Sequence, residues 1–412
     1  MPLSALRLLH PDLKAAVIGH LSPKAKLRSN LWCRSFRGLE NSRLAWDNCH
    51  YLGVRLLNNG VAFRVGKGSA VKSGRMGVDE AWRFLQLLQS RVDPGTVKVS
   101  VGKKVIGFQQ LLQDFLRSLS NVKSLILEFD KVDDVATPPF VGPIVATSAT
   151  LTSLKIVTVP SVSLPSAHFG PALHMCRKLE SLTFAGSGNI SEADRNRLCS
   201  AVCAMSRLNR LLVRFDANEE AEEDLSAQAL FKEKHVGRLL NGCTRLRSLE
   251  MLSVRPLDLT DASFDGVCCK SLQRWDMPFM TSGAAGAGGH WAGELPLSRL
   301  RTICPNLKEC SCSCALGGNE SAQRAATELA DWLLSTAETS SRPSALTVSL
   351  ASMDPTLVIA NDGRLLGQLL SHPPLRGRPL EMTTTDEDDG KGACHVITCG
   401  KATLKLLLRD RD

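Results

Sequence analysis

The sequence predicts an α/β solenoid in which short parallel strands alternate with covering helices. Three observations support this class. One apolar pattern occurs seven times, its spacing suits one strand plus one helix, and the intervals between occurrences carry helical periodicity. A sustained internal period of this length is typical of repeat architectures.

The recurring pattern is an apolar residue, two polar residues, an apolar residue, one variable residue and a third apolar residue. All 21 of these anchor positions are apolar when cysteine counts as apolar, whereas only Ile126 and Leu212 are apolar among the 21 residues between them. Such alternation predicts a strand that buries one face. The seven middle anchors are Leu125, Leu154, Leu182, Leu211, Leu249, Trp275 and Cys310.

The spacing of the middle anchors supports a repeating strand–helix unit. Consecutive anchors are 29, 28, 29, 38, 26 and 35 residues apart. The two long steps contain the acidic segment 216–224 and the glycine-rich segment 283–293, and such insertions usually become loops. One step before Leu125 lies Val97, in the alternating stretch 97–101, which predicts an earlier strand.

Helices are predicted between the strands. Residues 107–119 carry apolar residues at spacings of three and four, as an amphipathic helix does. Ser191 with Asp194 resembles a capping box at the start of another helix. Residues 225–240 and 321–338 predict two further helices.

Composition narrows the class of protein. A chain with 43% hydrophobic and 22% charged residues is expected to fold. The net charge of +9 is spread along the chain, so a nucleic-acid partner is not expected. No apolar run reaches the roughly 18–20 residues that span a bilayer, so no membrane association is expected.

The expected location is cytoplasmic or nuclear, because the chain has fourteen cysteines and no secretion signal. An alternative is mitochondrial, because residues 1–39 hold seven Lys or Arg residues and only one acid.

Four cysteines lie three residues before a first anchor, at Cys176, Cys243, Cys269 and Cys304. The run Cys304-Pro305-Asn306-Leu307 resembles the cysteine-containing leucine-rich repeats, and the resemblance covers about residues 95–350. It departs from that family where Ser148 and Met205 replace the cysteine, and where the usual asparagine after the strand is mostly missing. The resemblance implies a curved solenoid and leaves the ligand open.

The first fifty residues predict a separate helical unit with breaks at Pro11 and at Ser22-Pro23. A Leu/Pro start, a short helix, a Leu-Ser-Pro turn, a Leu-x-x-x-Leu-x-Cys-Arg-x-Phe-Arg-x-Leu helix over 27–39 and a closing Trp46 resemble an F-box. In the first half, His10 separates Leu9 from Pro11, and the helix is one residue short. A cap over the first repeat and a transit peptide remain alternatives.

An F-box implies the substrate-recognition subunit of a Skp–cullin–F-box ubiquitin ligase. The implied partners are a Skp-type adaptor and a cullin, with an unknown protein target held by the repeats. The alternatives are a non-enzymatic scaffold in a multi-subunit complex, such as an organellar ribonucleoprotein, and a regulator of a small GTPase. Carried over by position, the resemblance implies the adaptor-binding residues Leu9, Pro11, Leu13, Ile18, Leu21, Leu27, Leu31, Cys33, Phe36 and Leu39.

The residues that follow the middle and last anchors predict a target-binding face. If the anchors point into the core, their neighbours lie on the concave surface of the solenoid. A few residues usually dominate an interface, and we expect Leu212 and Arg214 at its centre. The whole set is Lys98, Ser100, Ile126, Glu128, Lys155, Val157, Thr183, Ala185, Leu212, Arg214, Glu250, Leu252, Asp276, Ser311 and Ser313.

The chemistry-bearing residues predict no enzyme. Cys310 and Cys312 fall on core anchors, where a free cysteine acts as a small hydrophobe, so a metal site with Cys304, Cys314 and Cys268-Cys269 is not favoured. The group Cys394-His395 and Cys399 is an equally weak metal candidate. No phosphate loop, nucleophile elbow or His-Glu-x-x-His motif is present. We therefore expect no catalytic residues, no cofactor and no metal.

The predicted organisation has four parts. Residues 1–50 form the F-box-like unit and residues 51–95 connect it to the repeats. The repeats occupy residues 96–350. Residues 351–412 form a C-terminal cap with a flexible loop over 372–392, and residues 396–408 supply a last strand.

Overall fold

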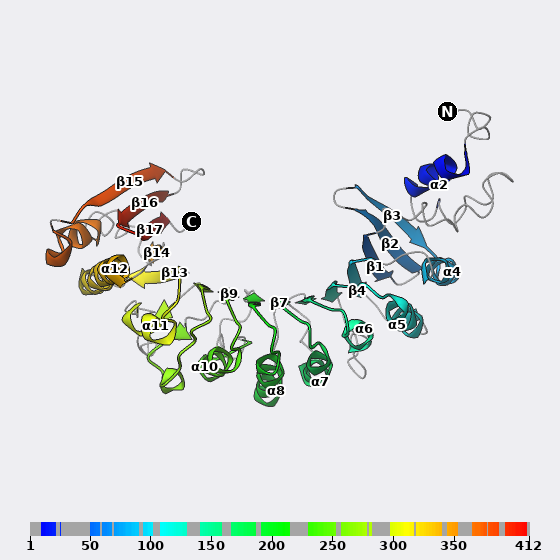
Figure 1. Ribbon diagram of the computed structural model, residues 1–412, viewed down its shortest axis with the longest axis horizontal. Coiled ribbons are helices and arrows are strands. Elements are labelled where there is room, and N and C mark those ends of the chain that lie inside the picture. Colours follow the sequence, from blue (N-terminus) through cyan, green and yellow to red (C-terminus); the bar gives the residue numbers. More distant parts are fainter. Residues whose placement is uncertain are drawn as a thin grey trace. The chain divides into compact units, whose positions relative to one another are not determined.

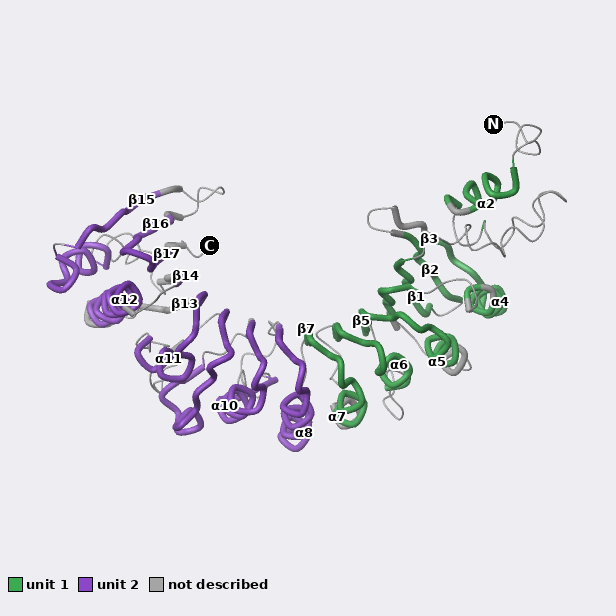
Figure 2. Tube along the Cα trace, viewed as in Figure 1, with its two compact units in different colours: residues 1–190 green, residues 191–412 purple. Residues whose placement is uncertain are grey.

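The chain forms two compact units, residues 1–190 and residues 191–412, in a computed structural model (Figure 2). The structure describes residues 10–21, 25, 50–57, 60–67, 70–89, 94–101, 108–129, 141–158, 166–186, 191–214, 230–252, 257–277, 280–281, 297–316, 319–339, 344–352, 365–376, 378–386 and 392–409.

The first unit is built on a sheet with the strand order β7-β6-β5-β4-β1-β2-β3. The strands are β1 (Tyr51–Leu57), β2 (Gly60–Lys67), β3 (Ala70–Met76), β4 (Thr96–Val101), β5 (Ser124–Phe129), β6 (Ser153–Thr158) and β7 (Ser181–Ala185). Strands β1, β4, β5, β6 and β7 run parallel, and β1, β2 and β3 form an antiparallel meander at one edge. The helices are α2 (Pro11–Gly19), α4 (Val78–Gln89), α5 (Phe108–Ser118), α6 (Val141–Thr147) and α7 (Ser166–Met175).

The second unit is built on a sheet with the strand order β15-β16-β17-β14-β13-β11-β9-β8. The strands are β8 (Arg210–Arg214), β9 (Ser248–Leu252), β11 (Arg274–Met277), β13 (Glu309–Leu316), β14 (Ser344–Ser352), β15 (Leu380–Asp386), β16 (Gly392–Cys399) and β17 (Ala402–Arg409). Pairing is parallel from β8 to β17 and antiparallel through β17, β16 and β15. Two short strands, β10 (Leu257–Asp258) and β12 (Met280–Thr281), pair separately.

The helices of the second unit are α8 (Glu192–Cys203), α10 (Glu233–Gly242), α11 (Leu297–Ile303) and α12 (Asn319–Thr339), with the short 3-10 helices η5 (Ala262–Phe264) and η6 (Pro373–Leu375). Helices α4 to α7 lie along one side of the first sheet, and α8, α10, α11 and α12 lie along one side of the second (Figure 1). Both sheets are open and mostly parallel, with helices between consecutive strands, and this confirms the predicted α/β class.

The middle anchors form the core of each unit. Leu154 pairs with Leu125 on one side and Leu182 on the other, and Leu211 pairs with Leu249. All five side chains are fully buried. Burying a leucine side chain contributes roughly 1.5–3 kcal/mol, so the repeated register supplies a large part of the stability of each sheet. The anchors therefore lie inside adjacent parallel strands within each unit, as the alternation predicts.

Residues 51–95 do more than connect, because most of them form β1, β2, β3 and α4. Leu52, Val54 and Leu56 of β1 are buried, and so are Val61 and Phe63 of β2. Gly60, with φ +154°, is the first residue of β2. Apolar residues alternate along β1 and β2, and these strands extend the sheet beyond β4. The segment expected to be a connection is therefore part of the sheet.

Two expectations for the second unit also change. The expected loop 372–392 includes β15, whose residues pair with β16, and the expected last strand over 396–408 is two strands, β16 and β17. They turn at Gly400, whose φ of +59° suits glycine because it has no Cβ. The helix expected over 225–240 begins at Glu233, and residues 225–229 lie outside the described part.

The described N-terminal residues form α2. Pro11 occupies its first turn, where a missing backbone N–H costs nothing, and His10 caps it by accepting a hydrogen bond from the Asp12 amide. Ile18 is buried, whereas Leu13 is 56% exposed. No helix in the described part of the chain has the length and apolar content to cross a membrane.

Candidate binding faces of the two sheets

In the first unit the helices cover one side of the sheet (Figure 1), and the anchors are buried there. The residues between the anchors therefore lie on the other side, here called the open face of that unit. Because successive side chains alternate, the strand register lines them up in rows. One row contains Gly53, Lys98, Ile126, Lys155 and Thr183. The next contains Arg55, Ser100, Glu128, Val157 and Ala185.

Glu128 connects β4 to β5 on this face. Its carboxylate lies 2.5 Å from the Lys98 ammonium and accepts a hydrogen bond of 3.0 Å from the Ser100 hydroxyl. Ser100 is only 5% exposed, so it supports Glu128 and offers little surface to a ligand, contrary to expectation. Ile126, Val157, Thr183 and Ala185 are half-buried and Lys155 is exposed, so they remain candidates for contact.

The open face of the second unit carries charges that neutralise one another. The Arg210 guanidinium donates two hydrogen bonds to the Glu250 carboxylate, at 2.8 and 3.1 Å. Arg274 lies 2.6 Å from Asp276 and 3.7 Å from Glu309. The hydrogen bond to Asp276 raises the pKa of Arg274 above its ordinary value.

The predicted contact residues of the second unit occupy different environments. Leu212 is half-buried and Arg214 is exposed. Glu250 and Asp276 are engaged by arginines, and Ser311 is half-buried. The side chains of Leu252 and Ser313 lie outside the described part of the structure. The expected centre at Leu212 and Arg214 therefore lies beside a charge-paired region.

The sequence interpretation missed the first residue of several strands. Arg210, Arg274 and Glu309 lie two residues before Leu212, Asp276 and Ser311, so they share the same face. The same period-two alternation was sufficient to find them. The arginines of β1, β2 and β3 were missed because those strands were not predicted.

The cysteines of the repeat pattern pack in the core. Cys176, Cys243, Cys269 and Cys304 are buried, and so are Cys310 and Cys312. The Cys243 thiol donates to the carbonyl of Val202, at 3.7 Å, in the preceding repeat. Burial raises the pKa of Cys176 to about 12, so this thiol stays protonated. Among the described residues, no three His, Cys, Asp or Glu side chains are placed to bind a metal.

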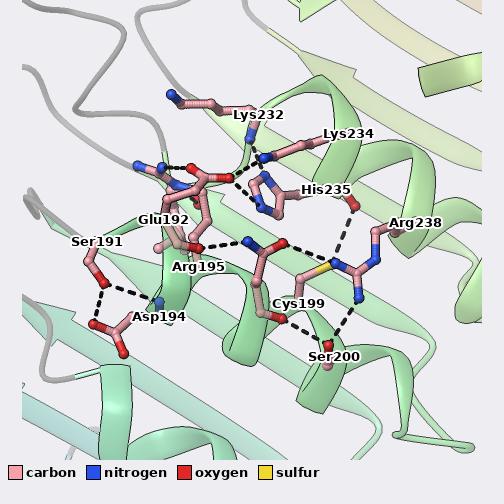
Figure 3. A network of polar contacts seen from close by, with 12 residues as sticks. Ser191, Glu192, Asp194, Arg195, Cys199, Ser200, Lys232, Lys234, His235 and Arg238 are labelled. Carbon is pink, nitrogen blue, oxygen red and sulfur yellow. Dashed lines mark hydrogen bonds and ion pairs between the residues drawn. The ribbon is translucent and has the colours of Figure 1, made fainter. Parts of the chain in front are cut away.

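A second polar cluster lies between α8 and α10, on the helical side (Figure 3). Arg195 is 3% exposed and donates to the Leu230 carbonyl at 3.0 Å and to Glu192 at 2.6 Å. His235 is fully buried, its Nδ1 accepts from the Lys232 amide at 3.2 Å, and its Nε2 lies 3.5 Å from Glu192. The contacts run from one repeat to the next, so the cluster has a structural role.

The pKa values of the two titratable groups of this cluster are both lowered, but for different reasons. Hydrogen bonds from Lys234 and Arg195 lower the pKa of Glu192 to about 2. Burial lowers the pKa of His235 to about 4, although the neighbouring Glu192 carboxylate acts in the other direction. At neutral pH, Glu192 is ionised and His235 is neutral.

The adaptor-binding residues implied by the F-box resemblance are only partly described. Pro11 and Leu13 are exposed on α2, Leu21 is half-buried, and Ile18 points into the core. The others, which are Leu9, Leu27, Leu31, Cys33, Phe36 and Leu39, lie outside the described residues.

No protein-family model matches the chain, and a comparison with curated proteins also finds no match. The functional assignment therefore depends on the geometry of the open faces and on the resemblances in the sequence.

Proposed function

We propose that this protein is an F-box and leucine-rich-repeat substrate receptor of a Skp–cullin–F-box ubiquitin ligase, and that it holds a protein target on the open faces of its sheets. The observation that supports target binding is the one-sided cover of both sheets, because α4 to α7 lie along one side of the first sheet and α8, α10, α11 and α12 along one side of the second (Figure 1). The other side presents rows of side chains at fixed register on parallel strands. Such rigid rows suit recognition of another macromolecule.

Leu13 supports the adaptor half of the proposal. At 56% exposed on α2, it offers apolar surface at a position that the F-box resemblance assigns to adaptor contact. Ile18 is fully buried and serves the core of its own unit instead. We therefore expect Leu13 to contact the Skp-type adaptor directly.

A pull-down of the tagged full-length chain tests the adaptor half. We expect the Skp-type adaptor and cullin to co-purify, and deletion of residues 1–50 to remove both. Leu13→Glu should also abolish their capture, whereas Ala16→Glu, at another exposed position on α2, should leave it unchanged. If neither partner co-purifies with the full-length chain, the alternative of a non-enzymatic scaffold is favoured.

The target half is tested on the second unit. Leu212 and Arg214 lie on the open face of β8, and replacing both with alanine should weaken target capture. The control is Arg245→Ala, which removes an exposed cation from the turn before β9. Target capture that is the same for the double variant and the wild type would contradict this use of the face.

A further inference from the structure

Cations gather at the meander edge of the open face in the first unit. Arg75 and Arg55 flank Ala62 in one row of the sheet. Arg64 and Lys98 flank Gly53 in the next row. These four cations and Lys155, which lies two strands beyond Lys98, are here called the basic face.

Most of this positive charge is not neutralised. The only carboxylate on the described rows of this face is Glu128, which is already paired with Lys98 at 2.5 Å. Arg64, Arg75 and Lys155 are exposed, and within the described part of the chain no ion pair involves any of the three. In the second unit, by contrast, Arg210 and Arg274 have carboxylate partners.

The residues around these cations are small. Tyr51 covers Gly53, because an added Cβ on this glycine would lie only 3.1 Å from the Tyr51 hydroxyl and 3.2 Å from the Arg64 Cβ. Ala62 occupies the corresponding place between Arg55 and Arg75. A carboxylate can reach the exposed guanidinium groups of Arg64 and Arg75, whose planar donors suit it.

An aliphatic strip adjoins the basic face. Ile126, Val157 and Ala185 are half-buried on the same side of β5, β6 and β7. Tyr51 is the one aromatic residue on the described rows of this face. A single-stranded nucleic acid would require several aromatic stacking partners, whereas a protein segment can supply both acidic and aliphatic side chains.

We propose that the open face of the first unit binds a protein segment in which acidic residues adjoin aliphatic ones. The acidic residues bind Arg64 and Arg75, and the aliphatic residues pack on Ile126 and Val157. This proposal rests on the proposed function, because it names the chemistry of the target. It does not require the adaptor contact at residues 1–50.

Fluorescence anisotropy on the purified full-length chain tests the proposal. The probe is a labelled synthetic peptide with a run of glutamates followed by alternating leucine and serine. We expect binding that weakens as salt rises, because exposed charges are screened. Arg64→Gln with Arg75→Gln should weaken it about tenfold, which corresponds to about 1.4 kcal/mol. The control, Arg177→Gln with Lys178→Gln, removes two exposed cations from the turn before β7 and should leave the affinity unchanged.

Three further measurements complete the test. A peptide with serine in place of glutamate, and another with serine in place of leucine, should each bind more weakly than the probe. A labelled single-stranded RNA of mixed sequence should also bind more weakly. Equal affinity of the Arg64/Arg75 variant for the probe, no binding of the probe, or tighter binding of the RNA would each overturn the proposal. Capture of the Skp-type adaptor should be the same in this variant, so failure here is distinguishable from failure of the proposed function.

Discussion

Glu128 of β5 lies 2.5 Å from Lys98 of β4, and the two residues are 27% exposed on the open face of the first unit. The ion pair places one negative charge among five cations of the basic face. Glu128 therefore limits how strongly this face attracts acidic ligands. Lys98 can bind a ligand carboxylate only in competition with Glu128.

Replacing Glu128 with glutamine should strengthen binding of the acidic peptide about threefold, because it removes a competing carboxylate. Partly exposed ion pairs stabilise proteins by only about 0–1 kcal/mol, so the free energy of unfolding should fall by no more than this. Anisotropy and urea unfolding measure the two effects. Glu180→Gln removes an exposed carboxylate before β7 and should change neither. Weaker peptide binding by the Glu128 variant would contradict the expectation.

Two adjacent positions on β6 should differ sharply in their effect on stability. Leu154 is fully buried between Leu125 and Leu182, so Leu154→Ala should lower the free energy of unfolding by about 3–5 kcal/mol. Lys155 is exposed on the other face, and Lys155→Ala should change it by less than about 0.5 kcal/mol. Urea unfolding monitored by circular dichroism measures both. Similar losses of unfolding free energy for the two variants would show that the anchor residues do not form the stabilising core.

Stability should fall in mild acid because of His235. Burial lowers its pKa to about 4 in the folded chain from about 6.5 in the unfolded chain, so the fold favours the neutral ring. This contribution is present above pH 6.5 and is lost as the pH falls toward 4. The full loss is about 3 kcal/mol. Glu192 adds a second loss below about pH 4.5, because its pKa is lowered to about 2.

Unfolding free energies measured from pH 7 to pH 4 test this expectation. His235→Asn should flatten the slope between pH 6.5 and pH 4, because asparagine does not titrate and its carbonyl can still accept from the Lys232 amide. His174→Asn removes an exposed imidazole from α7 and should leave the slope as it is in the wild type. An unchanged slope in the His235 variant would assign the acid sensitivity to other groups.

Cys203 should be more reactive than the buried thiols. The neighbouring thiols of Cys199 and Cys243, with a smaller contribution from the Arg238 guanidinium, lower the pKa of Cys203. Its side chain is half-buried, whereas Cys176 is buried and its pKa is raised to about 12. Because the thiolate is the nucleophile, iodoacetamide at pH 7 should modify Cys203 first of the two.

Mass spectrometry of labelled peptides over time gives the two rates. Arg238→Gln should raise the pH at which Cys203 labelling becomes fast, because it removes a cation that lowers the pKa of this thiol. A difference in exposure alone would not produce this shift. Arg207→Gln removes an exposed cation from the turn before β8 and should leave this pH dependence unchanged. Equal rates for Cys203 and Cys176 would contradict the expected activation.

The sequence alone was sufficient to predict the buried strand residues and a helix start within the repeats. Alternation around Leu154, Leu182 and Leu249 predicted strands with one buried face, and Ser191 with Asp194 predicted the start of α8, where the Ser191 hydroxyl accepts from the Asp194 amide. These features arise from backbone periodicity and from contacts only a few residues apart. They are therefore visible in local sequence.

Only the tertiary structure decided which charges meet on the open faces. Arg64 lies across Gly53 from Lys98 because β1 pairs with β4, where paired residues are 45 positions apart in the chain, and nothing local to these residues indicates that pairing. Likewise, Glu128 is neutralised by Lys98, although both were predicted as contact residues from alternation alone. The side that a residue faces depends on local backbone geometry, whereas its neighbours across strands depend on the register of pairing.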